Sequence, residues 1–457
     1  MSLWTSREIA AATGGTASAD FAVDGVTFDS REVGPGDLFL ALKGETTDGH
    51  RFVDQAFERG AAGTVVSAET AHPHVCVADT TAALNALGAA SRVRATTTTV
   101  IGVTGSVGKT GTKEALWAAL DRSDPGRAHR SVKSYNNHTG VPLSLARMPA
   151  GSRYGVFEMG MNHAGELAEL TRLVRPHIAL VTTIAPAHMG FFANEEAIAD
   201  AKGEIFQGLE PGGTAIVPFD SPHRERLIAA ARPHAARIVT FGLDRCADVH
   251  AVEQMRTRTG GTYVTARLGD RELSFTIAQP GQHWVSNALA VLAAVDAAGG
   301  DLEQAGLAFA EMGGLPGRGA RFLARVAGGE ALVIDESYNA NPSSMRATLA
   351  VLGAESAPRK LAVLGEMREL GSGSAGFHAA LAAPVTSAGV GFAILVGEEM
   401  QPLAKALEGR VEFVHVADAA TARDRLNDVL SPGDAVLIKG SNGVGLAKVV
   451  DALAGRA

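Results

Sequence analysis

The sequence predicts an α/β protein of three domains in which helices cover parallel sheets. β-Branched apolar runs alternate with helix-like segments through most of the chain, as expected for strand–helix–strand units. The 53 glycines and the low aromatic content of 5% suit many tight turns between strands and helices. At roughly 150 residues per domain, a chain of 457 residues divides into three such domains.

The first expected domain, residues 1–97, is a small α/β unit. The segment SLWTSREIAAATG predicts an opening helix, and FAVDGVTFDSREVGPGDLFLAL predicts two strands interrupted at Pro35 and Gly36. A polar, glycine-rich loop then leads into a helix that begins near Arg51.

Two polar clusters precede that helix: the DSR run around Ser30, and a second group with Lys43, Asp48 and His50. A loop of small, donor-rich residues before a helix can hold a phosphate or a sugar. The residues taken alone favour a solvated loop over a binding site.

The central domain is expected over residues 98–316 and repeats the strand–helix pattern. Besides the strand near residue 100, strands are predicted at 154–160, 177–184, 213–219 and 236–242. The segment 248–280 alternates polar and apolar residues between turn residues, which predicts antiparallel hairpins. The domain is therefore expected to be a doubly wound parallel sheet with antiparallel hairpins, with ligands beyond the carboxyl ends of its strands.

The segment VIGVTGSVGKTGTKE, residues 100–114, carries the strongest functional pattern. A β-branched strand precedes TGSVGKT and a helix follows it. A glycine-rich turn in this position directs backbone N–H groups at phosphate oxygens, at the positive end of the helix dipole. Lys109 would reach the β- and γ-phosphates, and the Thr110 hydroxyl would bind Mg²⁺. The segment predicts a P-loop of the form T-G-[ST]-x-G-K-[ST], because Val103 replaces the first glycine of the general form.

The last domain is expected over residues 317–457 and resembles a Rossmann-like nucleotide-binding sheet. After EALVIDESYNANP, four strand–helix units follow, with strands at KLAVLGEM, FAILVG, VEFVHV and DAVLIKG. Gly440, Gly443 and Gly445 come after the last strand with G-x-x-G-x-G spacing. They therefore do not predict a dinucleotide site.

Composition and charge exclude several classes of protein. The net charge is −8, from 41 basic and 49 acidic residues, and no strongly basic segment predicts nucleic-acid binding. Cys76 and Cys246 are far apart and have no metal-ligand spacing. The N-terminus lacks the features of a signal peptide, and no apolar run approaches the roughly 18 residues of a membrane helix. We expect a cytoplasmic protein that neither inserts into membranes nor binds nucleic acid.

Two chemically capable side chains follow strands of the central sheet. Glu158 closes the strand at 154–160, where a carboxylate in the same domain as a P-loop is well placed to hold Mg²⁺. His188 follows the strand at 177–184 through Ala-Pro-Ala. A lone histidine there is more often structural, and its candidacy as a ligand rests on sharing this sheet edge with Glu158.

Lys202 lies among the apolar positions of a predicted helix, NEEAIADAKGEIFQGL. It follows Ile198 by four residues and precedes Ile205 and Phe206 by three and four. Burial lowers the pKa of a lysine, so that part of the amine is neutral. A neutral amine near a metal can take up CO₂ and become a carbamate, which is an anionic oxygen ligand. A lysine that extends to solvent from the edge of the apolar face fits the spacing equally well.

Asp335 ends the strand ALVI and precedes the turn YNANP, residues 338–342. A turn rich in Asn beside a Tyr can grip a ribose and cover a base, or it can cap the helix that begins at Ser343. Arg318 lies just inside the junction between the last two domains. A cation there would reach nucleotide phosphates when the domains close.

Six segments, in order along the chain, resemble one enzyme family. They are TGSVGKTGTKE, YNNHTGVPLSLARM, EMGMNHAGEL, IAPAHMGFFANEEAIADAKGEIF, DESYNANPSSM and VLGEMRELG. Together they resemble the Mur ligases of peptidoglycan synthesis, and the similarity covers nearly the whole chain. SYNANPSSM and LGEMRELG are most similar to the family member that adds D-Ala-D-Ala. DSR and ALKGETTDGH also resemble the UDP-substrate segments of that enzyme.

The resemblance implies an ATP-dependent ligase that joins D-Ala-D-Ala to UDP-MurNAc-tripeptide. The tripeptide carboxylate would attack the γ-phosphate of ATP, and the dipeptide amine would attack the resulting acyl phosphate. The products would be UDP-MurNAc-pentapeptide, ADP and phosphate, in the service of cell wall biogenesis, cell shape and cell division. The first domain would hold the UDP group, and the last would close over ATP and help to bind the dipeptide. A monomer is expected.

The resemblance also implies roles for individual residues. Lys109 and two Mg²⁺ ions would stabilise charge on the transferring phosphoryl group. Thr110 and Glu158 would hold one Mg²⁺, and Glu158, His188 and carbamylated Lys202 would hold the other. The catalytic residues implied are Lys109, Glu158, His188 and Lys202. The nucleotide contacts implied are Gly105, Ser106, Gly108, Lys109, Thr110, Asn287, Arg318, Asp335, Asn339 and Asn341. The substrate contacts implied are Ser30, Lys43, Asp48, His50, Asn136, Asn137 and Thr139.

The chain departs from the family pattern at several positions. Gly111 replaces the usual Ser or Thr after GKT, and Thr183 and Ala185 stand where Asn and Gly are common. Asn442 and Ala447 stand where Arg and Glu are frequent, which leaves the dipeptide contacts open.

Other functions are less consistent with the residues. A related Mur or folylpolyglutamate-type ligase that adds a single amino acid is the alternative, although the last domain contains no D-N-P-R motif. A P-loop switch or kinase would not need Glu158, His188 and Lys202 together. The third residue of the tripeptide, diaminopimelate or lysine, is left open.

Overall fold

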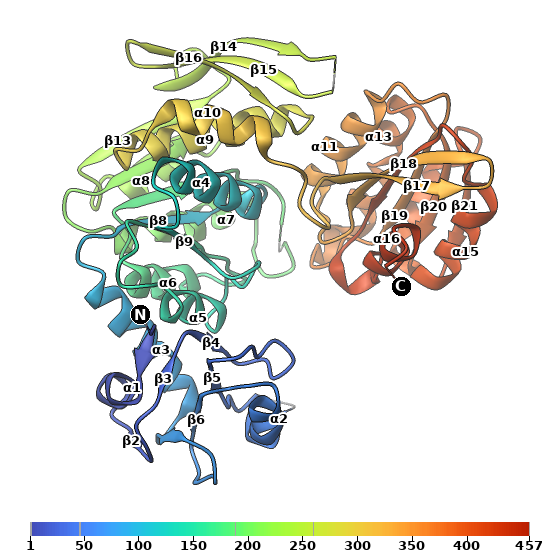
Figure 1. Ribbon diagram of the computed structural model, residues 1–457. Coiled ribbons are helices and arrows are strands. Elements are labelled where there is room, and N and C mark those ends of the chain that lie inside the picture. The colour runs from blue at the N-terminus through green and yellow to red at the C-terminus, as the bar shows by residue number, and fades with distance from the viewer. Residues whose placement is uncertain (1, 45–46, 188, 259, 457) are drawn as a thin grey trace.

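The computed structural model describes residues 2–44, 47–187, 189–258 and 260–456. Three sheets of five, nine and six strands follow one another along the chain, and helices cover them (Figure 1). β1 (Trp4–Thr5) and β3 (Ala22–Val23) form a separate antiparallel pair. The predicted α/β class with parallel sheets is confirmed. No helix among the described residues is long and apolar enough to cross a bilayer.

The five-stranded N-terminal sheet lies at the bottom of Figure 1. Its spatial order is β2 (Thr16–Ala17), β7 (His74–Cys76), β6 (Gly63–Val66), β5 (Asp37–Leu40) and β4 (Gly25–Thr27). Only β2 runs antiparallel to its neighbour. The helical segments are α1 (Ser6–Thr13), η1 (Gly49–Phe52), α2 (Val53–Glu58) and α3 (Thr80–Arg94). As predicted, Pro35 and Gly36 separate two strands, and a helical segment begins near Arg51.

The N-terminal sheet shares its hydrophobic core with a helix of the central region, α5 (Gly140–Ala146). Leu143 and Ala146 are buried in the same cluster as Leu38 and Leu84. The indole N–H of Trp4 donates to the Ala146 carbonyl at 2.8 Å. The two regions are therefore joined by apolar packing and not only by surface contacts.

The central sheet has nine strands. Its spatial order is β16 (Arg271–Ile277), β15 (Thr262–Leu268), β14 (Val249–Arg256), β13 (Arg237–Gly242), β12 (Thr214–Pro218), β11 (Ile178–Val181), β8 (Thr99–Thr104), β10 (Tyr154–Glu158) and β9 (Ala128–Arg130). Strands β14 to β9 are parallel, whereas β15 and β16 form the predicted antiparallel hairpins. The three-residue strand β9 was not predicted.

Helices cover both faces of the central sheet because its strands are apolar on both sides. Ile101 and Val103 face one core, and Val100 faces the other. The first core contains α4 (Lys109–Ser123), α9 (Gln282–Ala297) and α10 (Leu302–Glu311). The second contains α5, α6 (Glu166–Val174), α7 (Glu195–Gly203), η2 (Glu204–Gly208) and α8 (Arg224–Ala231).

The C-terminal sheet has six strands and lies at the right of Figure 1. Its spatial order is β17 (Ala320–Val326), β18 (Gly329–Glu336), β22 (Ala435–Lys439), β19 (Lys360–Gly365), β20 (Val390–Val396) and β21 (Glu412–Val416). All neighbours are parallel except β17, an antiparallel edge strand that the sequence pattern did not reveal. The helical segments are α11 (Pro342–Gly353), η3 (Gly371–Gly373), α12 (Ser374–Ala379), α13 (Ala382–Ser387), η4 (Glu398–Met400), α14 (Gln401–Leu407), α15 (Ala419–Val429), η5 (Asn442–Val444) and α16 (Ala447–Leu453).

Candidate active site

The P-loop joins β8 to α4 at the carboxyl edge of the central sheet. Gly108 is the N-cap residue of α4 with φ +90°, and Gly105 has φ +150°. A Cβ on Gly105 would lie 1.9 Å from the Thr182 hydroxyl oxygen. That hydroxyl donates to the Val107 carbonyl at 2.6 Å and so ties the loop to the end of β11. Position 105 therefore requires glycine.

Lys109 and Thr110 begin α4 directly after the loop. The Lys109 ammonium donates to the Gly105 carbonyl at 2.6 Å. Burial lowers the pKa of Lys109, and the nearby Glu158 carboxylate opposes that shift. The Thr110 hydroxyl lies 3.3 Å from the hydroxyl of Ser134. Lys109 thus lies close enough to Glu158, at the end of β10, to feel its charge, and Thr110 faces Ser134.

Glu158 is the last residue of β10 and is fully buried. Its Oε1 accepts a hydrogen bond from the Asn136 side chain at 2.7 Å, and its backbone N–H donates to Ser131 Oγ at 2.9 Å. Its Oε2 is buried without a hydrogen-bond partner among the described residues. A buried carboxylate oxygen without a donor is costly unless a ligand completes it.

Lys202 lies on α7 with only 1% of its surface exposed. Of the two interpretations open from the spacing, burial on the apolar face is correct and extension to solvent is not. Burial lowers its pKa well below the ordinary lysine value, and the positive charge of Lys109 lowers it further. His188, the other expected ligand from this sheet edge, lies outside the described residues.

A cavity of about 500 Å³ brings most of the expected residues together between the central and C-terminal sheets. Its expected lining residues are Ser106, Gly108, Lys109, Thr110, Asn136, Glu158, Asn287, Arg318, Asn339 and Asn341. It is also lined by residues that the sequence did not single out, namely Ser134, His283, Trp284, Glu336 and Lys439. Gly105, Asn137, Thr139, Lys202 and Asp335 do not line it.

The Asp335 side chain accepts hydrogen bonds from residues near the cavity, whereas its neighbour Glu336 lines the cavity itself. The Asp335 carboxylate accepts hydrogen bonds from the backbone N–H of Gly317 at 2.7 Å and from the Ser337 hydroxyl at 2.7 Å. Glu336 lies 3.5 Å from the ammonium of Lys439, its register partner on β22. Burial raises the pKa of Glu336 and lowers the pKa of Lys439. Successive strand residues face opposite ways, which is why Glu336 and not the expected Asp335 faces the cavity.

The YNANP turn combines the two roles that its sequence left open. Asn341 is the N-cap of α11 and accepts the Ser344 backbone N–H at 2.9 Å, and it also lines the cavity. The Arg318 guanidinium lies 4.3 Å from the centre of the Tyr338 ring. This stacking places a cation from the junction over the turn.

The first turn of α9 forms another wall of the cavity. His283 and Asn287 are four residues apart and share a helix face, a spacing that was visible in the sequence. Burial lowers the pKa of His283 to about 4, so it is neutral near pH 7. A Cβ on Gly111 would lie 3.0 Å from the ring of Trp284. The glycine that departs from the family pattern therefore makes room for this tryptophan.

The expected substrate residues of the N-terminal region lie outside the cavity and form hydrogen bonds within that region. Ser30 donates to the Gln55 side chain at 2.9 Å. His50 Nε2 accepts the Ser67 backbone N–H at 2.9 Å, so its Nδ1 carries the proton and donates to Asp48 Oδ1 at 2.6 Å. Lys43 pairs with Asp48 through an isolated backbone bridge.

Asn137 and Thr139 lie at the start of α5. The side-chain oxygen of Asn137 accepts the backbone N–H of Gly140 at 2.9 Å, and Thr139 is the N-cap residue. These two residues connect the Asn136 segment to the helix that packs on the N-terminal sheet.

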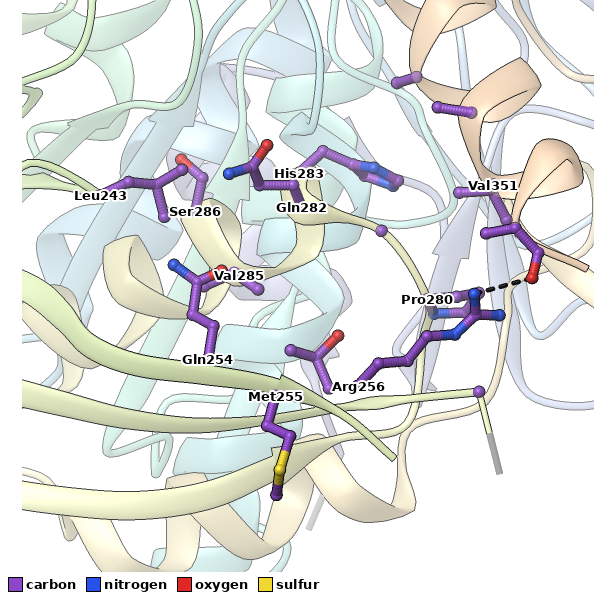
Figure 2. Close-up of a pocket in the computed structure, with 16 residues that line it drawn as sticks. Leu243, Gln254, Met255, Arg256, Pro280, Gln282, His283, Val285, Ser286 and Val351 are labelled. Atoms are coloured by element: carbon purple, nitrogen blue, oxygen red, sulfur yellow. Dashed lines mark hydrogen bonds between the residues drawn. The ribbon is translucent and has the colours of Figure 1, made fainter. Parts of the chain in front are cut away.

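A second cavity, of about 640 Å³, lies beside the first between β14, the start of α9 and α11 (Figure 2). Arg256 reaches across it and donates to the Ala354 carbonyl at the end of α11 at 2.7 Å, the bond drawn as a dashed line in Figure 2. His283 lines both cavities. At another point the Gly190 backbone N–H donates to the Glu369 carbonyl at 2.9 Å. The end of α11 and the loop after β19 thus each contact the central region outside the first cavity.

Known proteins are similar to this chain over nearly its whole length. The profile of the Mur ligase family catalytic domain matches residues 22–97, that of the Mur ligase middle domain matches 103–295, and that of the glutamate ligase domain matches 321–442. The UDP-N-acetylmuramoyl-tripeptide–D-alanyl-D-alanine ligase of Synechocystis sp. is 35% identical and covers 95% of this chain and 93% of its own length. The Escherichia coli enzyme of that name is 34% identical, with coverages of 95% and 94%.

Solved structures give the same result. A crystal structure of MurF from Acinetobacter baumannii has a TM-score of 0.84 and 30% identity, and covers 98% of each chain. MurF ligase from Thermotoga maritima in complex with ADP has a TM-score of 0.75 and 25% identity, with coverages of 94% and 97%. On its sequence, its fold and the order of its domains, the chain belongs to the Mur ligase family.

Proposed function

We propose that this chain joins D-alanyl-D-alanine to UDP-MurNAc-tripeptide with hydrolysis of ATP to ADP and phosphate. The observation that carries the proposal is that curated relatives named for this reaction are at least 30% identical over at least 91% of their own length. The cavity supports it, because one space contains a P-loop, a buried carboxylate and residues from the C-terminal sheet. The product is a peptidoglycan precursor.

ATP is proposed to occupy the 500 Å³ cavity with its phosphates at the P-loop. The first backbone N–H groups of α4 have no partner within the helix and are available to phosphate oxygens. Lys109 is held beside the loop by the Gly105 carbonyl, from which it can transfer its hydrogen bond to a phosphate. Asn287, Arg318, Asn339 and Asn341 line the remaining walls, where the nucleoside is proposed to lie.

The donor set around Glu158 fits Mg²⁺. Glu158 Oε2 has no partner among the described residues, and the Thr110 hydroxyl lines the same cavity. The described residues contain no group of three or more His, Cys, Asp or Glu side chains that would bind a metal alone. Mg²⁺ needs only one or two carboxylates when phosphate oxygens and water complete its coordination. Bound here, the metal would supply positive charge that stabilises the transferring phosphoryl group.

Lys202 is proposed to carry a carbamate that helps to hold the second Mg²⁺, together with Glu158 and His188. The lowered pKa favours the neutral amine that CO₂ requires. Addition of CO₂ forms an N–C bond and releases one proton, so the side chain changes from neutral to anionic. An anion at this position would complement the charge of Lys109, which otherwise disfavours a cation at Lys202.

Each of the three regions is proposed to bind a different part of the substrates. Residues 1–97 would hold the UDP group, 98–316 would bind ATP, and 317–457 would close over ATP and bind the dipeptide. The tripeptide carboxylate would attack the γ-phosphorus as ADP leaves, and the dipeptide amine would then displace phosphate from the acyl phosphate and lose a proton. The enzyme is proposed to act as a monomer. We place the reaction in the cytoplasm, where ATP is available.

The test is phosphate release from ATP and Mg²⁺ with UDP-MurNAc-tripeptide as acceptor. Release is expected with D-Ala-D-Ala and not with D-Ala, D-Glu or diaminopimelate, and mass spectrometry should detect UDP-MurNAc-pentapeptide. Release with a single amino acid would move the enzyme to another branch of the family. No release with any UDP-muramoyl acceptor would refute the proposed reaction.

The carbamate has its own test. Lys202→Ala is expected to lose turnover, and added bicarbonate is expected to restore part of it by supplying an anionic oxygen ligand. A carbamate signal in the NMR spectrum of protein exchanged with ¹³CO₂ should disappear in the variant. Full activity of Lys202→Ala without bicarbonate would contradict the carbamate.

A further inference from the structure

Lys113 is a fully buried lysine one turn after Lys109 on α4. Buried lysines are rare and need partners. The Lys113 ammonium donates to the Lys133 carbonyl at 2.7 Å and to the Ser131 carbonyl at 3.3 Å. It also lies 2.6 Å from the carboxylate of Glu114. Three oxygens therefore hold this cation, and two of them belong to the backbone of one segment.

That segment, residues 131–136, touches both proposed metal ligands. Ser131 Oγ accepts the backbone N–H of Glu158, and the Asn136 side chain donates to Glu158 Oε1 at 2.7 Å. Ser134 lies 3.3 Å from the hydroxyl of Thr110. The segment is thus the only described stretch outside the P-loop that we find bonded to both side chains.

The backbone of this segment is held in an unfavourable conformation. Lys133 has φ +49°, in the left-handed region that residues other than glycine rarely adopt. The carbonyl of this same residue receives the shorter hydrogen bond from Lys113. Such conformations persist when surrounding contacts over-determine them. The hydrogen bond from Lys113 on α4 is one such contact.

We propose that Lys113 is a positioning residue for the metal and phosphate site. It holds segment 131–136 so that Ser134 faces Thr110 and Asn136 faces the Glu158 carboxylate. This inference rests on the proposed function for the identity of the site, but not on which amine the enzyme ligates. Without the cation, the buried Ser131 carbonyl and the part-buried Lys133 carbonyl lose this donor, and the segment can relax away from Glu158.

The experiment compares metal and nucleotide binding in three variants. Lys113→Met keeps the length of the side chain without its charge, and Lys113→Arg keeps the charge. Lys405→Met makes the same change at an exposed position of α14. Mn²⁺ is used as the probe, with its binding to each protein and ADP followed by electron paramagnetic resonance. For Lys113→Met we expect Mn²⁺ affinity to fall about tenfold, the equivalent of about one lost charge-assisted hydrogen bond. Lys113→Arg should recover part of the loss, and Lys405→Met should bind as the unchanged chain does.

Hydrogen exchange distinguishes positioning from general destabilisation. In Lys113→Met the amides of 131–136 should exchange faster, while those of β8 and β12 keep their protection. In steady-state assays the Mg²⁺ requirement should rise while KM for D-Ala-D-Ala stays the same. If Lys113→Met does not fold, Lys113→Gln, which has two N–H donors but a shorter side chain without charge, takes its place with the same expectations.

Two results would overturn the inference. One is Mn²⁺ affinity within about twofold of the unchanged chain together with unchanged exchange in 131–136. The other is absence of Mn²⁺ binding by the unchanged chain with ADP. Failure of the proposed function would appear separately, because the unchanged chain would then release no phosphate with any UDP-muramoyl acceptor, or would release it with a single amino acid.

Discussion

Replacing Gly105 by alanine tests whether the P-loop is held in place by its contact with β11. The added Cβ would lie 1.9 Å from Thr182 Oγ1 and 3.1 Å from Thr182 Cβ. Either the hydroxyl rotates away or the loop moves. Rotation breaks the hydrogen bonds from this hydroxyl to Val107 at 2.6 Å and to Thr104 at 3.2 Å.

The expected effect on nucleotide binding follows from these contacts. Holding alanine at φ +150° costs about 1–3 kcal/mol, and losing a hydrogen bond costs about 1 kcal/mol more. A relaxed loop must recover its shape when the phosphates bind, so binding weakens by the sum of about 2–4 kcal/mol. At about 1.4 kcal/mol per tenfold, the Kd for Mg·ADP should rise about 30- to 700-fold.

Titration calorimetry with Mg·ADP measures this change. Gly126→Ala is the matched control, because Gly126 also has positive φ but a Cβ there would meet nothing within 4 Å. The double variant Gly105→Ala with Thr182→Ala removes the clashing hydroxyl and should bind about tenfold more tightly than Gly105→Ala alone. Binding by Gly105→Ala within about threefold of the unchanged chain would refute the reasoning, as would no recovery in the double variant.

Three other changes have defined outcomes. Glu158→Gln keeps the side-chain shape but removes the charge of the proposed metal ligand. In a phosphate-release assay, Mg²⁺-dependent turnover should therefore fall by at least about 100-fold. Retained turnover would exclude a role for Glu158 in metal binding. Arg256→Ala removes the hydrogen bond to the Ala354 carbonyl, so small-angle X-ray scattering should show a larger radius of gyration. An unchanged radius would mean that this contact does not hold the C-terminal region against the central one. Burial lowers the pKa of His129 to about 4 from about 6.5 when unfolded, so unfolding takes up a proton between these values and stability falls as the pH drops. His129 should therefore contribute a loss of about 2 kcal/mol between pH 7 and pH 5, and urea unfolding of His129→Gln at both pH values should show a smaller difference than the unchanged chain.

Sequence periodicity was sufficient to predict most strands of the central and C-terminal sheets. Apolar β-branched runs identified the parallel strands of the central and C-terminal sheets, and paired turn residues identified the hairpins of β14, β15 and β16. It missed β9, which has three residues and pairs only with β10. It also missed β17, because an antiparallel edge strand is defined by its partner β18 more than by its own pattern.

Local spacing located parts of the candidate site, and tertiary contacts decided the rest. The i−4, i+3 and i+4 neighbours of Lys202 placed it on the apolar face of its helix, because helical periodicity is local. They left burial and extension to solvent equally open, and tertiary packing decided for burial. The sequence indicated Asp335, but Glu336 faces the cavity, because the pairing of β18 with β22 decides which face of the strand turns to it. Lys113 carried no sequence pattern of its own, since its partners are backbone carbonyls about twenty residues away.

The core shared between the N-terminal sheet and α5 has a consequence for which acceptors the enzyme can use. Leu143, Ala146 and Trp4 fix the N-terminal sheet to the region that holds the P-loop. If the UDP group is anchored at one end and ATP at the other, their separation is constant during turnover. The length of the peptide between the two groups then decides whether its carboxylate reaches the phosphate. A peptide one residue shorter or longer than the tripeptide would place its carboxylate away from the γ-phosphorus, however tightly its UDP end is bound.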